Sequence, residues 1–92
     1  GDDLRKIAID LRSANSNSVV ALLSNNDGKP VLVVAVSDQS RAAGVKAGAL
    51  VKIGSTVLGG GGGGKDDFAQ GGGTDSSKSL DAIAAISQSL IG

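Results

Sequence analysis

Several kinds of functional group are missing from this 92-residue chain. It has no cysteine, histidine, methionine, tryptophan or tyrosine, and Phe68 is its single aromatic residue. Without cysteine there is no disulfide framework and no thiolate zinc site, and without histidine the usual general base is absent. Every acidic residue is an aspartate, and the adjacent Asp66 and Asp67 would diverge in a strand, which suits a solvated turn better than an acid–base pair. We therefore expect no catalysis, metal or cofactor in this chain.

Long apolar runs are missing as well. The longest, Val31–Val36, is far too short to cross a bilayer, which needs about 20 apolar residues. The N-terminus has no basic region leading into an apolar one, as a secretory signal would. We expect a cytoplasmic protein without membrane contact, and we treat residues 1–92 as one small globular domain.

Charge is unevenly distributed, although nine basic and nine acidic residues cancel. Residues 28–65 carry five basic residues against one acidic residue, a net charge of +4, whereas residues 1–27 carry −1 and residues 66–92 carry −3. A cationic middle segment suits a polyanionic partner, although a solvated helix face explains the same charges. The basic residues of this segment are Lys29, Arg41, Lys46, Lys52 and Lys65.

Hydrophobic periodicity predicts a helix and then a β-hairpin in the first part of the chain. Apolar residues recur at i, i+3, i+4 and i+7 from Leu4 to Leu11, which is the stripe of an amphipathic helix. Continuous aliphatic runs at Val19–Leu23 and Val31–Val36 predict two strands buried on both faces. The intervening Asn25–Pro30 is rich in turn residues, so we expect the strands to pair as a hairpin.

A long helix is predicted over about residues 39–58 by a stripe of small and aliphatic side chains. Val45 falls on its outer face, which an independent soluble domain does not need. Gly44 and Gly48 lower its helix propensity, and this pair would allow a neighbouring element to pack closely.

The last part of the chain is expected to contain a short third strand that starts at Phe68 and Ala69. A final helix is predicted from about Asp75 to Leu90, with Thr74 or Asp75 as its N-cap. Its expected inward residues are Leu80, Ile83, Ala84 and Ile91. The predicted fold class is therefore α/β, with a small sheet (the hairpin plus the third strand) covered by three helices.

Glycine is concentrated in two blocks, Gly59–Gly64 and Gly71–Gly73, which hold nine of the fifteen glycines. A run of six glycines is typical of a flexible linker, but a slack tether inside one small domain would cost closure entropy. Glycine also lets backbone N–H groups approach a ligand closely, which suits phosphates and sugar edges. Because glycine has the largest ordering cost, we expect the first block to be mobile in the free state.

The two glycine blocks suggest two nucleotide-binding interpretations, a Walker A loop at the first block and an anion site at the second. Gly59–Lys65 matches most of a Walker A loop, but Asp66 stands where Ser or Thr should hold Mg²⁺, and the block follows a helix instead of a strand. We therefore reject a P-loop. The second block precedes the last helix, where its N–H groups could hold an anion at the positive end of the helix dipole. A tight turn capped by Thr74 or Asp75 explains the second block equally well.

Four segments together carry a resemblance to a known family: Ala47–Val51, Val57–Leu58, Gly59–Lys65 and Asp67–Asp75. They are similar to the C-terminal globular domain (C-Ala, DHHA1-type) of bacterial alanyl-tRNA synthetases, which belongs to a group shared with DHH-type phosphoesterases. The resemblance covers essentially the whole chain, and the double glycine motif around Ala69 and Gln70 is its most specific part. One departure is Asp66, where the family usually has proline.

The resemblance implies that this domain contacts the outer elbow of tRNA and helps one tRNA to serve the aminoacylation and editing sites. The implied partners are tRNA(Ala) and the remaining domains of a parent synthetase, and a homodimer is allowed. ATP, Mg and Zn would belong to parts of the parent that are absent here. The expected tRNA-binding residues are Gly59, Gly60, Gly61, Gly62, Gly63, Gly64, Lys65, Gln70, Gly71, Gly72 and Gly73, with Arg41 and Lys46 as auxiliaries and Lys29 as a further phosphate contact.

Two other functions remain open at this point. The chain could be the substrate-binding domain of a DHH-type phosphoesterase, but those relatives carry histidine in a comparable glycine motif, where this chain has Lys65. It could also be a dimerisation module that uses Val45 and a small-residue helix face. Since Phe68 stands alone, we expect no aromatic platform for bases, and zero net charge predicts weak RNA binding by the isolated domain.

Overall fold

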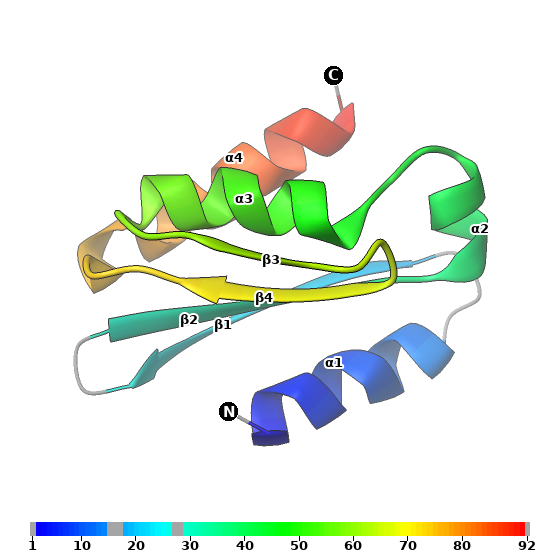
Figure 1. Ribbon diagram of the computed structural model, residues 1–92, viewed down its shortest axis with the longest axis horizontal. Coiled ribbons are helices and arrows are strands. Elements are labelled where there is room, and N and C mark those ends of the chain that lie inside the picture. The colour runs from blue at the N-terminus through cyan, green and yellow to red at the C-terminus, as the bar shows by residue number, and fades with distance from the viewer. Residues whose placement is uncertain (1, 15–17, 27–28, 92) are drawn as a thin grey trace.

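The computed structural model describes residues 2–14, 18–26 and 29–91 of the chain. Within these residues, four antiparallel strands form one sheet in the order β1-β2-β4-β3 (Figure 1). The strands are β1 (Val19–Asn26), β2 (Lys29–Val36), β3 (Gly62–Gly64) and β4 (Phe68–Gly72). The helices are α1 (Asp2–Ala14), α2 (Asp38–Ala42), α3 (Ala47–Val57), the 3-10 turn η1 (Ser76–Lys78) and α4 (Ser79–Ile91).

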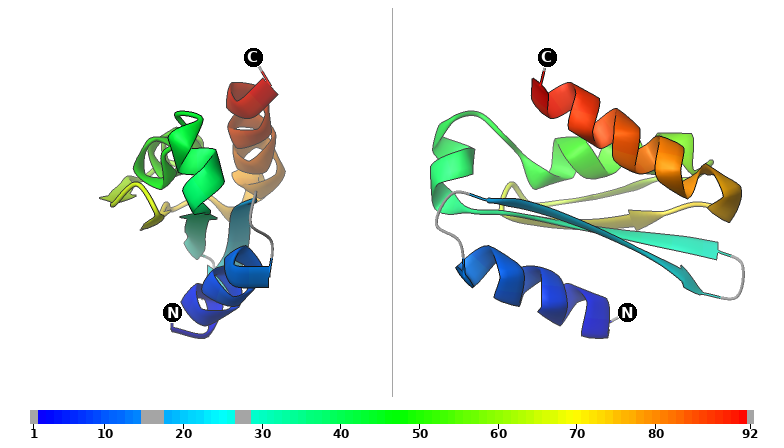
Figure 2. Two further views of the ribbon diagram at one scale, coloured as in Figure 1. Left: turned by 90° about the vertical axis from the view of Figure 1, so that its right-hand side faces the viewer. Right: turned by 180° about the vertical axis from the view of Figure 1, so that it is seen from behind.

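The elements form three layers, with the sheet in the middle. Helix α1 covers one face, and α3 and α4 cover the other (Figure 2). Among the described helices, none is both long and apolar enough to cross a membrane. The predicted α/β class is confirmed, and the sheet gains one strand, β3, that we did not predict.

The predicted hairpin is confirmed by the pairing of β1 with β2, from Val19 opposite Val36 to Asn26 opposite Lys29. The turn residues Asp27 and Gly28 lie outside the described residues. Burial on both faces holds for the central strand, where residues 32–36 are all buried. It does not hold for β1, where residues 19–23 are half-buried because this strand lies at the edge of the sheet.

Alternation along β2 divides the core between the two faces of the sheet. Leu32, Val34 and Val36 point into the larger cluster with residues of α3 and α4. Val33 and Ala35 point the other way, into a smaller cluster with Ala8 of α1 and, at its border, Phe68. The smaller cluster is thin, because Ile7 and Leu11 on the α1 stripe remain 49% and 44% exposed.

The long helix predicted over residues 39–58 is wrong, because the chain forms two helices there. Ser37 caps α2, and the chain turns after Ala42 through Gly44, whose φ of +100° ends the helix. The break changes the direction of Val45, which is half-buried against the larger cluster and not on an outer face. Close packing at Gly48 is confirmed, since a Cβ there would lie 3.3 Å from the carbonyl oxygen of Gly64.

The last helix starts later than predicted and presents a different face. Asp75 is the N-cap of η1, as expected, but α4 begins only at Ser79. Among the described side chains of α4, Ala82 and Ile86 are buried, whereas Leu80 is 84% exposed and Ala84 is also exposed, so these two predicted inward positions are wrong. The side chain of Ile91 lies outside the described residues. The 3-10 turn, with about 3.0 residues per turn, changes the phase of the helix relative to a continuous α-helix from Asp75.

Candidate functional site

The first glycine block begins as the end of α3. Gly59 follows the C-cap residue Leu58 and has a φ of +80°. The N–H of Gly59 donates to the carbonyl of Thr56 (N···O 3.2 Å), and the N–H of Gly60 donates to that of Ser55 (2.9 Å). These two bonds define a Schellman motif, in which the glycine ends the helix and turns the chain back toward the sheet.

The next glycines alternate between two environments. A Cβ on Gly60, Gly62 or Gly64 would lie 2.2, 2.4 and 2.7 Å, respectively, from the nearest backbone atom of β4. A Cβ on Gly61 or Gly63 would meet no heavy atom within 4 Å. The fold therefore requires glycine at residues 60, 62 and 64, because a side chain there would collide with β4. Packing does not require glycine at Gly61 or Gly63.

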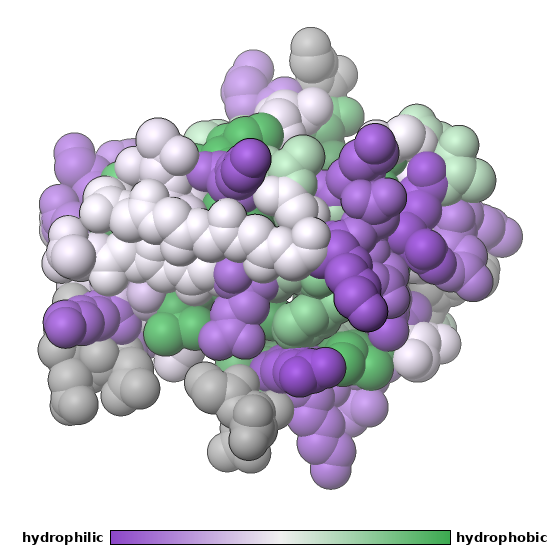
Figure 3. All heavy atoms as spheres, in the orientation of Figure 1, coloured by the Kyte–Doolittle hydropathy of each residue, from purple (hydrophilic) through white to green (hydrophobic). Residues whose placement is uncertain are grey.

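Gly60–Gly64 thus form an exposed band of bare backbone, which we name the glycine ridge. Figure 3 shows a continuous pale surface of near-neutral hydropathy where β3 runs in Figure 1. The prediction of a mobile block is not supported by this arrangement, because the block is a helix cap followed by an edge strand paired with β4. β3 has one neighbouring strand within the described residues, so its other edge is open to a partner.

The second glycine block also packs closely. Gly71 lies opposite Gly62 on β3, and a Cβ on Gly71 would lie 2.3 Å from Oγ of Ser55 on α3. A Cβ on Gly73 would lie 2.2 Å from the carbonyl oxygen of Leu58. These glycines let α3 and its C-terminal end lie directly on the backbone of β4, so their primary role is structural.

The anion site considered at the second block does not form, and the tight turn is confirmed. The N–H of Gly73 donates to the carbonyl of Pro30 (3.2 Å), and those of Thr74 and Asp75 both donate to that of Leu58 (3.0 and 3.1 Å). These donors are already used by the fold, so they are not directed at a ligand.

A carboxylate occupies the start of the last helical segment. Asp75 accepts hydrogen bonds from the hydroxyl and from the N–H of Ser77. The hydroxyl bond is the main cause that lowers the pKa of the Asp75 carboxyl, and Lys78 adds to this effect. The charge at this helix end is therefore negative, which disfavours an anionic ligand.

The turn between β3 and β4 is held by the first residues of α3. The N–H of Ala47 donates to the carbonyl of Asp66 (2.9 Å), and the N–H of Gly48 donates to that of Lys65 (3.2 Å). Lys46 precedes Ala47 directly, so the fold brings the predicted site residues Lys46 and Lys65 onto neighbouring backbone segments. Both side chains are exposed, as is that of Asp66.

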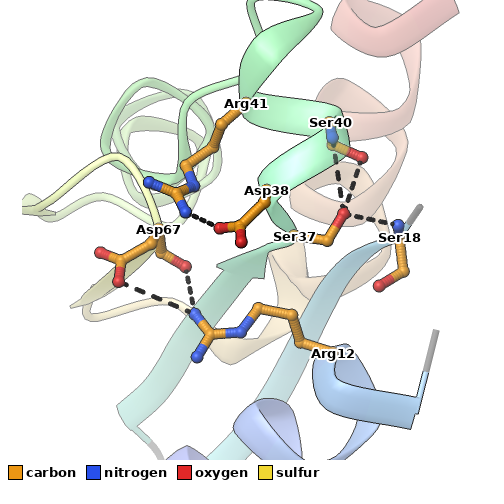
Figure 4. A network of polar contacts seen from close by, with 7 residues as sticks. All are labelled: Arg12, Ser18, Ser37, Asp38, Ser40, Arg41 and Asp67. Carbon is orange, nitrogen blue, oxygen red and sulfur yellow. Dashed lines mark hydrogen bonds and ion pairs between the residues drawn. The ribbon is translucent and has the colours of Figure 1, made fainter. Parts of the chain in front are cut away.

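Arg41 is placed near this turn but has a partner. Its guanidinium is ion-paired with Asp38 of the same helix, which reduces its availability to another anion (Figure 4). Below it, Arg12 of α1 donates to the carbonyl of Asp67 (2.9 Å) and lies 4.0 Å from its carboxylate. The Arg12 contact ties the start of β4 to α1, and Asp67 lies in the predicted turn with its side chain 43% exposed.

Gln70 lies beside the glycine ridge, whereas Lys29 lies away from it. Gln70 is exposed on β4 and pairs with Gly63 of the glycine ridge. Lys29 lies at the start of β2, at the end of the sheet where that strand pairs with the second glycine block. The predicted cations are therefore split between two ends of the sheet.

Sequence reasoning missed Arg5 of α1, which the fold brings beside the turn. Its guanidinium carbon lies 5.2 Å from the centroid of the Phe68 ring, within the range of a cation–π contact. Arg5 and Phe68 line one shallow hollow together with Gly63, Lys65 and Gln70. No sequence signal could have found Arg5, because its proximity to Phe68 depends on how α1 packs on the sheet.

The groups exposed at the β3 edge of the sheet are suited to binding a ligand. Among the described residues, no group of three or more aspartates could hold a metal ion. What the edge offers is bare backbone at Gly61 and Gly63, with cations from Lys46 and Lys65 beside it. Such a surface suits close contact with a polyanion.

These features define a class of small α/β domain in which a glycine-built sheet edge lies beside a helix with a Schellman cap. The DHHA1 domain family matches residues 1–92, and the chain belongs to this family. The fold is that of the C-Ala domain from Aquifex aeolicus alanyl-tRNA synthetase, with a TM-score of 0.91 and 34% identity. That comparison covers 99% of this chain and 81% of the solved one.

Similar sequences occur in alanine–tRNA ligases. The ligase of Paenarthrobacter aurescens (strain TC1) is 51% identical over 87 residues, which cover 92% of this chain. That of Renibacterium salmoninarum is 52% identical over 91 residues, which cover 97% of this chain. In both cases the chain spans 10% of the length of the relative. The resemblance noted from the glycine motif is confirmed.

Proposed function

We propose that this chain is the tRNA-binding C-terminal domain of an alanine–tRNA ligase, which holds the elbow of tRNA(Ala) through the glycine ridge. The observation that supports this most directly is the bareness of Gly61 and Gly63, where packing leaves room for a side chain. A surface without side chains lets backbone amides approach the 2′-hydroxyls and phosphates of a folded RNA. Lys65 and Lys46 add phosphate contacts at one end of the ridge.

The parent enzyme would be an ATP-dependent ligase whose Mg²⁺ and Zn²⁺ sites lie in other domains. The relatives, which are named as alanine–tRNA ligases, support this assignment over that of a phosphoesterase. In the parent, this domain would assist both aminoacylation and editing of tRNA(Ala). A homodimer stays a prediction, although Val45, which motivated it, is half-buried within the fold.

The test is binding of this chain to intact tRNA(Ala) and to a minihelix of acceptor stem and T arm, which lacks the elbow. We expect tighter binding to the intact tRNA. Gly63→Leu should weaken it at least about tenfold, which corresponds to about 1.4 kcal/mol. Lys65→Ala should lower the slope of log K against log salt by about one.

The matched control is Ala84→Leu, which places the same side chain on an exposed position of α4. Both leucine variants should unfold at temperatures close to that of the wild type. Elbow binding through the ridge would be disproved by a Gly63→Leu variant that binds intact tRNA as tightly as Ala84→Leu does.

A further inference from the structure

The hollow lined by Arg5, Phe68 and Lys65 lies directly beside the glycine ridge, on the side of the sheet that Gly63 faces. On β4, Phe68 packs against the smaller core cluster on the α1 side of the sheet, and Gln70 is two residues further along the strand, so it points to the same side. Gly63 is paired with Gln70 and shares that side. The hollow measures about 330 Å³, at the lower end of the range for small-ligand sites, which suits one nucleotide better than a longer segment.

Arg5 gives this hollow a flat cationic wall. Phe68 is half-buried and held by the core, so its ring is a fixed support. The exposed Arg5 guanidinium lies over this ring, 5.2 Å from its centroid. A guanidinium held this way is partly preorganised, so less side-chain entropy is lost when a second planar group stacks on it.

The charges around the hollow favour an anionic nucleotide. Arg5 and Lys65 are exposed cations that line it, and Asp67 is the carboxylate among its lining residues. The Asp67 carboxylate lies 4.0 Å from Arg12, which offsets its charge. Asp66 is exposed nearby and weakens the effect of Lys65 without cancelling both cations.

We propose that the hollow takes one unstacked nucleotide of the bound RNA, whose base stacks on the Arg5 guanidinium while its phosphate contacts Lys65. Unstacked bases of RNA loops are commonly bound by aromatic rings and by guanidinium planes, and Phe68 supports the plane here. This inference rests on the proposed tRNA binding and adds a contact from α1 that lies outside the glycine motif.

The test compares tRNA(Ala) binding by variants of this chain at fixed salt. Arg5→Ala should weaken binding about tenfold, in the range found for loss of one stacked base. Arg5→Lys keeps the charge but loses the plane, so we expect a loss of similar size. Phe68→Leu removes the support for the guanidinium and should also weaken binding, with thermal unfolding measured to confirm that the variant is folded.

The control is Lys6→Ala, which removes one exposed cation from the next position of α1. We expect it to change affinity less than about twofold at the same salt. Full recovery of affinity in Arg5→Lys, or equal losses in Arg5→Ala and Lys6→Ala, would overturn base stacking on Arg5. Wild-type chain that binds no tRNA would overturn the proposed function itself, whereas wild-type affinity in Arg5→Ala would overturn this inference alone.

Discussion

The two halves of the sheet are packed by opposite means. In the half made by β1 and β2, aliphatic side chains fill the space between the sheet and the helices, and Leu32–Val36 are all buried. In the half made by β3 and β4, the glycines have no side chains, so helix α3 can pack directly on the backbone of the strands. There the paired Gly62 and Gly71 lie directly against Val51 and Ser55 of α3.

This difference shows that a glycine-rich segment can be as tightly specified as a hydrophobic core. In the half made by β1 and β2, removing side-chain atoms should destabilise the fold. In the half made by β3 and β4, adding side-chain atoms should destabilise it. Gly61 and Gly63 follow neither rule, since an added Cβ meets nothing there. That exception is what separates glycines needed for folding from glycines that are available for binding.

The largest expected effect is in the aliphatic half. Leu32→Ala removes a fully buried side chain from the larger cluster and should lower the free energy of unfolding by about 2–5 kcal/mol. Leu80→Ala removes the same atoms from a side chain that is 84% exposed. This variant should change the free energy of unfolding by no more than about 0.5 kcal/mol. Urea unfolding measures both, and similar losses in the two variants would contradict the packing described here.

A smaller effect is expected from adding one methyl group in the glycine half. In Gly60→Ala the Cβ would lie 2.2 Å from the carbonyl oxygen of Gly72, so the strand must shift and stability should fall by about 1–3 kcal/mol. Gly61→Ala, one residue further along, should leave stability unchanged or raise it by up to about 1 kcal/mol, because it restricts the unfolded chain. Equal stability of the two variants in thermal unfolding would refute the alternation of packed and open glycines along the ridge.

The smallest effect is expected where α3 meets the glycine half. Oγ of Ser55 is buried and has no hydrogen-bond partner within the described residues. Ser55→Ala removes this unsatisfied group and should leave the free energy of unfolding unchanged or raise it by about 1 kcal/mol. Ser37→Ala is the matched control, since it removes the cap of α2 and should lower stability by about 1 kcal/mol. A loss in Ser55→Ala as large as that in Ser37→Ala would show that the Ser55 hydroxyl is satisfied in solution.

Much of the architecture could be predicted from local patterns. The hairpin followed from two aliphatic runs around a turn-rich segment, and side-chain chemistry narrowed the last cap to Thr74 or Asp75, of which the structure uses Asp75. The errors occurred where long-range packing competes with periodicity. The break at Gly44 directs α3 onto the sheet, and the 3-10 turn η1 shifts the phase of α4 so that Leu80 is exposed.

The candidate site was predictable only in part. Glycine composition located the ridge, and the resemblance to the family added Lys65 and Gln70, but neither could distinguish Gly60 from Gly61. They also gave no indication of Arg5, whose neighbour Phe68 is distant in the chain.

Local sequence therefore specified the fold class, the hairpin, the cap of the last helical segment and the family, because these depend on residues close together along the chain. Three-dimensional packing set the rest: the division of the glycines into positions packed against β4 and open positions, and the placement of Arg5 over Phe68. The physical reason is that side-chain direction alternates along an edge strand, and only the neighbouring strand and helix determine which direction is filled.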